Sequence, residues 1–230
     1  DSYNTAVGYV AGNAVTTGRF NTFVGGLVGD ANTVGDHNTA MGYNSLGANL
    51  VGDRNVAIGS GTLRSLAPSA NADTYNTAVG YDAGQAVSTG IQNTFVGGLA
   101  GDGTDDGAYN TAVGHVALSA NCGNENTAVG YAALTSATGA DNTAVGSAAG
   151  FSLTSATAGV FLGKYAGIYA TTADNSTFVG FQAGQGITGT KLTGNGNTAV
   201  GKDAGLTLQG AAASNTFVGD SAGAAVTTST

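Results

Sequence analysis

The chain has 230 residues, among them 40 Gly, one Pro, one Cys and no Trp, and its formal net charge is −8 with only six Lys and Arg. So few basic residues cannot form the positive patch that nucleic acid or an anionic membrane surface requires, and no run of about 18 apolar residues offers a membrane span. With 42% hydrophobic residues in a regular rhythm, the composition also excludes intrinsic disorder.

One five-residue phrase, first met as Asn-Thr-Ala-Val-Gly at Asn4, recurs thirteen times. Consecutive copies mostly start 17 residues apart, with two gaps of 21. A fixed period of this kind is the signature of a solenoid, in which each repeat forms one coil. The copies begin at Asn4, Asn21, Asn38, Asn55, Asn76, Asn93, Asn110, Asn126, Asn142, Gly159, Ser176, Asn197 and Asn215.

Each phrase predicts a short strand, because Val and Thr suit a pleated surface and the Gly at its fifth position allows a sharp turn. A looser segment such as x-x-Ala-Gly follows and predicts a second short strand, before a Thr/Ser-rich stretch that often contains another Gly. Abundant Gly and β-branched residues argue against helix. We therefore predict an all-β fold: a parallel β-solenoid or β-roll of about 13 coils, forming a single repeat domain over residues 1–230.

If consecutive coils stack, the repeated residues of the phrase lie one above another and can bond to each other. Asn side chains that lie one above another are expected to form a hydrogen-bonded ladder, and the Thr hydroxyls to do likewise. Solenoids usually carry atypical capping repeats at their ends. Neither end of this sequence looks capped, and a following molecule would continue the repeat in register, so the sequence is expected to be either a stretch of a longer fibre or a subunit that stacks head to tail into a filament.

The third and fourth positions of the phrase are both apolar, although alternation places them on opposite faces of the strand. A strand that is apolar on both faces is normally covered on both. One face fills the interior of the coil, although the sequence alone does not decide which one. The other face is most simply covered by another copy of the chain along a shared axis, so a homotrimer is expected. The candidate subunit-interface residues are those at position three: Ala6, Phe23, Ala40, Ala57, Ala78, Phe95, Ala112, Ala128, Ala144, Phe161, Phe178, Ala199 and Phe217.

The phrase, with its variants Asn-Val-Ala-Ile-Gly at Asn55 and Asn-Thr-Ala-Met-Gly at Asn38, resembles the S-V-A-I-G repeat of trimeric autotransporter adhesin heads. The stretch NTAVGYAALTSATGADNTAVG from Asn126 to Gly146 is similar to the repeats of phage and phage-like tail-fibre proteins. The resemblance covers essentially the whole chain. It implies a left-handed parallel β-roll wound as a trimer, located outside the cell on a cell surface or a virion.

No residue pattern indicates catalysis, a metal or a cofactor. His37 and His115 lie at different places in the repeat and are interpreted as surface residues, and Cys122 as an inert small residue. Asp102, Asp105 and Asp106 offer oxygen ligands but lack the spacing of a calcium loop, so a solvated acidic loop is expected. Aromatic residues flank many phrases, and Tyr9, Tyr43, Tyr81 and Tyr131, which directly follow the Gly, are candidate contacts for a cell-surface glycan.

The sequence thus favours a non-enzymatic structural or adhesive fibre protein. An ice-binding solenoid is one alternative. It is suggested by the Thr column formed by Thr5, Thr22, Thr39, Thr77, Thr94, Thr111, Thr127, Thr143, Thr177, Thr198 and Thr216. A tailspike-like protein that binds or degrades glycans is another alternative, and degradation would need paired carboxylates at a groove.

Overall fold

The computed structural model describes residues 2–227, and it confirms the predicted fold: a parallel β-solenoid of about thirteen coils, without helix among these residues. The chain divides into two compact units, Asp1–His115 and Val116–Thr230. That residues 1–230 form a single domain stays a prediction, and the two units are described in turn.

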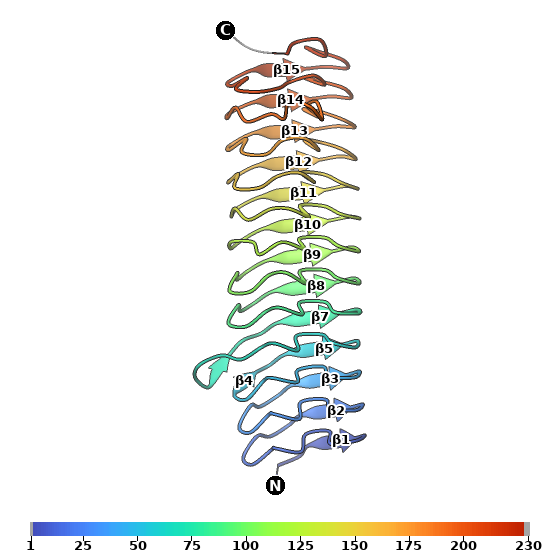
Figure 1. Ribbon diagram of the computed structural model, residues 1–230, viewed down its shortest axis with the longest axis vertical. Helices are drawn as coiled ribbons and strands as arrows, with labels where there is room; N and C mark the ends of the chain where they lie inside the picture. The colour runs from blue at the N-terminus through green and yellow to red at the C-terminus, as the bar shows by residue number, and fades with distance from the viewer. Residues whose placement is uncertain (1, 228–230) are drawn as a thin grey trace. The chain divides into compact units, whose positions relative to one another are not determined.

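The strands of the first unit lie one above another (Figure 1). They are β1 (Thr5–Val7), β2 (Thr22–Val24), β3 (Thr39–Met41), β4 (Gly52–Asp53), β5 (Val56–Ile58), β6 (Ala72–Asp73), β7 (Thr77–Val79), β8 (Thr94–Val96) and β9 (Thr111–Val113). The seven three-residue strands pair in parallel in chain order and in strict register, so that Thr77 lies beside Thr94 and Val79 beside Val96. The phrase therefore sets the register of the sheet.

The second unit repeats this arrangement (Figure 1). Its strands are β10 (Thr127–Val129), β11 (Thr143–Val145), β12 (Val160–Leu162), β13 (Thr177–Val179), β14 (Thr198–Val200) and β15 (Thr216–Val218), and all are parallel to their neighbours. The register is kept even where the phrase changes, since Phe161 at position three of one coil lies beside Ala144 and Phe178.

The two longer coils place their extra residues outside the regular winding. In the first unit, β6 follows the insertion and pairs in parallel with β4, so that Gly52 lies beside Ala72. In the second unit, Ile187 and Thr190 form an antiparallel bridge at the tip of the insertion, and Leu192 then returns to bridge Ala170. Each insertion is thus absorbed without loss of register in the strands that follow.

The prediction of a second strand in each coil is wrong. The looser segment is a run of turns, because alternate residues adopt left-handed φ, as at Val10 (φ 48°) and Gly12 (φ 59°). Asn13 N donates to Val10 O three residues earlier at 3.3 Å, whereas Gly12 N donates to Val28 O of the next coil at 2.9 Å. Turn bonds and coil-to-coil bonds therefore alternate, and this segment satisfies its backbone without becoming a strand.

The Gly that ends every phrase is required by both conformation and space. Gly97 has φ 135°, a conformation that side-chain-bearing residues rarely adopt. A Cβ added to Gly97 would lie 2.6 Å from the carbonyl oxygen of Gly114, the equivalent residue in the next coil. Any other residue at this position would push neighbouring coils apart.

The Asn ladder is confirmed, with backbone groups as its main partners. Asn93 Oδ1 accepts a hydrogen bond from Asn110 N at 2.9 Å, and Asn93 Nδ2 donates to Gly107 O at 2.8 Å. The Asn93 backbone N–H in turn donates to Asn76 Oδ1 at 3.0 Å. Each Asn side chain therefore holds the turn by which the chain enters the next strand.

Two positions of the core vary together. Position three is Ala or Phe, and position nine, four residues after the phrase's Gly, is Leu or Gly. Leu occupies position nine only where position three is Ala both in its own coil and in the next coil. The four Leu are Leu46, Leu63, Leu118 and Leu134, all fully buried.

Contacts explain this covariation. Phe95 is fully buried, and a Cβ at Gly101 of its own coil would lie 2.6 Å from its ring. A Cβ at Gly84 in the preceding coil would lie 2.9 Å from the same ring. Each Phe thus takes the space that a Leu fills elsewhere, in its own coil and in the one before it, which keeps the packing density of the interior constant.

Replacement of Asn93 by Ala should strongly destabilise the protein. It leaves the buried Asn110 N–H and Gly107 carbonyl without their partner, at a cost of about 1–3 kcal/mol each. We expect the free energy of unfolding in urea to fall by roughly 2–5 kcal/mol. The neighbouring Thr94→Ala change, on the exposed side of β8, should cost less than about 1 kcal/mol; equal losses for the two variants would contradict a specific role for the Asn.

Exchange of the core pair should show strong coupling. Phe95→Ala leaves a cavity and should cost about 3–5 kcal/mol, and Gly101→Leu alone should overpack the coil and cost about 1–3 kcal/mol or more. The double variant recreates the combination of Ala at position three and Leu at position nine that other coils contain. In one of these coils Leu63 has φ 46°, so Leu is compatible with the left-handed backbone at position nine. Denaturation of all four proteins should give a favourable coupling of about 1–3 kcal/mol, and simple additivity would refute the packing rule.

Candidate interaction surfaces

The residues expected at a subunit interface lie inside the chain's own coils, so this prediction is wrong. Eleven of the thirteen have at most 1% of their surface exposed: Phe23, Ala40, Ala57, Ala78, Phe95, Ala112, Ala128, Ala144, Phe161, Phe178 and Ala199. Ala6 is exposed and Phe217 half-buried, in the first and last copies of the phrase. The reason is that position three of each phrase points into the coil, where it packs against position nine.

The outward strand face consists of positions two and four of the phrases. It carries Thr or Val at position two and Val, Ile, Met or Leu at position four, and no charged residue at either. Val96 is 38% exposed, Met41 48% and Val145 41%. Because the strands are in register, Thr and apolar side chains form parallel columns in each unit, and this apolar face is uncovered within the chain.

Thr hydroxyls do bond from coil to coil, but at a different place in the repeat from the one expected. Thr16 Oγ1 donates to Thr33 O at 3.0 Å, and Thr33 Oγ1 donates to Leu50 O at 2.9 Å. These residues belong to the Thr/Ser-rich turns, not to the strands. The strand residue Thr94, by contrast, is exposed on the outward face.

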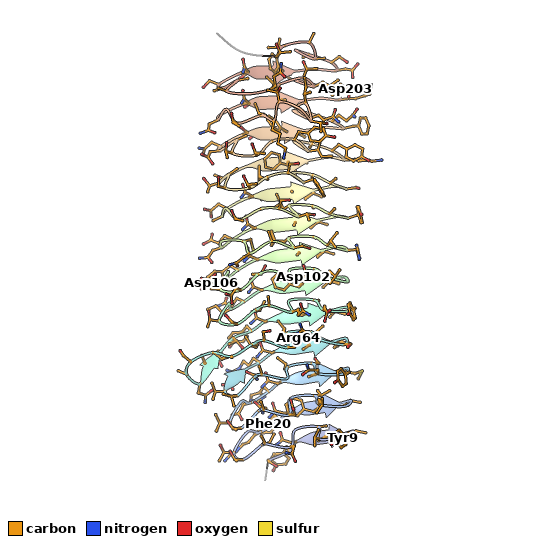
Figure 2. The ribbon with its side chains drawn as sticks, viewed as in Figure 1. Tyr9, Phe20, Arg64, Asp102, Asp106 and Asp203 are labelled. Carbon is orange, nitrogen blue, oxygen red and sulfur yellow. The ribbon has the colours of Figure 1, made fainter. Side chains whose placement is uncertain are left out.

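Three of the four candidate glycan-contact residues form a row in the first unit, called the tyrosine row here. Tyr9, Tyr43 and Tyr81 occupy the same place in alternate coils and are 79%, 61% and 63% exposed. Tyr9 lies beyond the end of β1 in Figure 2. The Tyr81 hydroxyl hydrogen-bonds the Asp82 carboxylate, which raises the pKa of this tyrosine. The fourth residue, Tyr131, has the same place in the second unit and is 61% exposed.

A second aromatic column precedes the strands, at positions that the sequence shows as flanking aromatics but that are not among the candidate glycan contacts. The rings of Tyr3 and Phe20 stack with centroids 5.4 Å apart, and Phe20 stacks on His37 at 4.9 Å. The Arg54 guanidinium lies 5.5 Å from the centre of the Tyr75 ring. The sequence indicates that these side chains lie in one column, because all five residues directly precede a copy of the phrase. Figure 2 shows Phe20 near the beginning of β2.

Carboxylates in the turns bond to the backbone of adjacent coils. Asp36 Oδ1 accepts from Arg19 N at 2.6 Å, and Asp53 Oδ1 accepts from Asp36 N at 2.7 Å. Burial raises the pKa of Asp53, and the nearby Asp36 charge adds to this effect. Arg54 forms an ion pair with Asp73. These contacts give Asp36, Asp53 and Asp73 a structural role.

The remaining candidate residues are dispersed. His37 stacks on Phe20, Cys122 is buried, and in the acidic loop Asp102 is half-buried whereas Asp105 and Asp106 are exposed. Within residues 2–227, no group of three or more His, Cys, Asp or Glu side chains is placed to hold a metal ion. The same residues contain no helix that could cross a membrane.

Comparison of the chain with protein-family models, with curated proteins and with solved structures finds no match.

Proposed function

We propose that this chain is a structural, non-enzymatic repeat segment of an extracellular adhesive fibre, on a cell surface or a virion, and that copies of it associate through the outward strand face. The observation that carries the proposal is the exposure of this face: an uncharged apolar stripe follows the strands of each unit, and Val96, Ile58 and Val113 are each more than a third exposed. A sheet with apolar residues on both sides is normally covered on both.

Copies of the same chain suit this face better than an unrelated partner. A stripe that repeats at every coil can meet the same stripe of another copy along a shared symmetry axis, with Val columns packing against each other. A homotrimer is the assembly that the resemblance to adhesin-head and tail-fibre repeats implies. Buried strand faces would then leave the turns, including the tyrosine row, exposed to a receptor.

A charge on the outward strand face should prevent assembly. We expect the purified protein to sediment as a trimer and Val96→Lys to shift it toward monomer, because an unpaired ammonium would be buried between subunits. Gln92→Lys adds the same charge at an exposed position before the phrase and should leave the trimer intact. A monomeric wild-type protein, or a Val96→Lys protein that remains trimeric, would contradict the proposal.

Ice binding is a second candidate, favoured by the exposure of the Thr column. Thr77, Thr94 and Thr111 lie side by side in register on adjacent strands, and on neighbouring strands they are about 4.8 Å apart. A flat array of Thr hydroxyls and Val methyl groups could order water at this face. It requires the outward strand face to be free, so this function and assembly through the face exclude each other.

Thermal hysteresis measured beside sedimentation separates the two candidates. If the fibre proposal holds, the protein is an oligomer and shows no hysteresis even at high concentration. A monomer with concentration-dependent hysteresis, abolished by Thr94→Lys and retained in Gln92→Lys, would instead establish ice binding. Circular dichroism of each variant verifies that the solenoid is intact.

A further inference from the structure

The tyrosine row has a period of two coils. Tyr9, Tyr43 and Tyr81 alternate with Gly26, Ser60 and Gly98, which occupy the same place in the coils between and after them. Because neighbouring parallel strands are about 4.8 Å apart, the rings recur about every 9.6 Å along the first unit. His115 continues the alternation after Gly98.

The small residues provide room for the rings. A Cβ added to Gly26 would lie 3.7 Å from Cδ2 of Tyr43, and one added to Gly98 would lie 3.4 Å from Cδ2 of His115. The Tyr43 and His115 rings thus lie close to the backbone of the preceding coil. Tyr43 is nevertheless 61% exposed, so much of its ring remains available to a flat ligand.

Aromatic faces that are open on one side bind the apolar C–H faces of sugar rings, while the hydroxyl stays in water. A linear row with a fixed period selects a glycan that is straight and has a matching repeat. In an extended β-1,4-linked chain every second sugar presents the same face, at a repeat close to two coil spacings. An α-1,4-linked chain of the same sugar curves into a helix and cannot contact three collinear rings.

We infer that the tyrosine row is a binding site for an extended β-1,4-linked polysaccharide, with one ring under every second sugar. The inference rests on the proposed adhesive role and gives the chemical class of its receptor. Assembly through the outward strand face is a separate property, since the row lies in the turn that follows each strand. The two can therefore fail independently.

Binding to microcrystalline cellulose and to soluble cellohexaose tests the site, with amylose as the helical chain of the same sugar. We expect the wild-type protein to bind both β-1,4-linked probes and to ignore amylose. Tyr43→Ala removes the central ring and should weaken binding by about tenfold. Tyr43→Phe keeps the ring and should bind nearly as wild type.

Tyr131→Ala is the matched control. Tyr131 occupies the same place in its coil and is as exposed as Tyr43, but Lys164 stands two coils further on where the row would need a ring. Its loss should leave binding unchanged. No binding of either β-1,4-linked probe, equal binding of amylose, or equal losses in the Tyr43→Ala and Tyr131→Ala proteins would each overturn the inference.

Sedimentation of the same proteins distinguishes failure of the site from failure of the proposed function. An oligomeric protein that binds no β-1,4-linked glycan overturns the site alone. A monomeric protein that binds through Tyr43 keeps the site and overturns assembly.

Discussion

The structure depends on hydrogen bonds between consecutive coils. A three-residue strand has almost no stability by itself, and here each one is held by the strands on either side of it. The turns obey the same constraint, because alternate N–H groups of the looser segment donate to a neighbouring coil. Asn93 and its equivalents extend this dependence to side chains. Stability is therefore a property of neighbouring coils, as in other solenoids, and no coil could fold alone.

The same constraint limits the choice of core residues. Coils that stack at a fixed spacing enclose a fixed cross-section, so a large residue at one position must be balanced by a small one nearby. Phe95 with Gly101 and Gly84 is one solution, and Ala57 with Leu63 is the other. The Ala and Phe of position three, which from sequence alone were candidate subunit-interface residues, instead fill the interior of the coils in alternative ways.

Sequence predicted the features that every coil repeats. The period, the strand at each phrase, the parallel register and the Asn ladder all follow from local residue preferences and from stacking. The predicted second strand failed because left-handed φ at non-glycine residues such as Val10 and Leu27 leaves no mark in propensity. The inward face of the strand was misassigned because positions three and four are both apolar. Only the pairing of position three with position nine, residues in different turns, distinguishes interior from surface.

With the faces assigned, each of the two units has an apolar strand face and turn surfaces that differ in character. The outward strand face varies little from coil to coil, so it suits a role that every coil shares, such as contact with identical copies. The turns vary freely, since Tyr43, Ser60 and Lys164 all occupy one place in the repeat. Variation confined to the turns lets recognition change without disturbing the stacking bonds or the core. A solenoid built in this way can keep one assembly while its turns are adapted to different receptors.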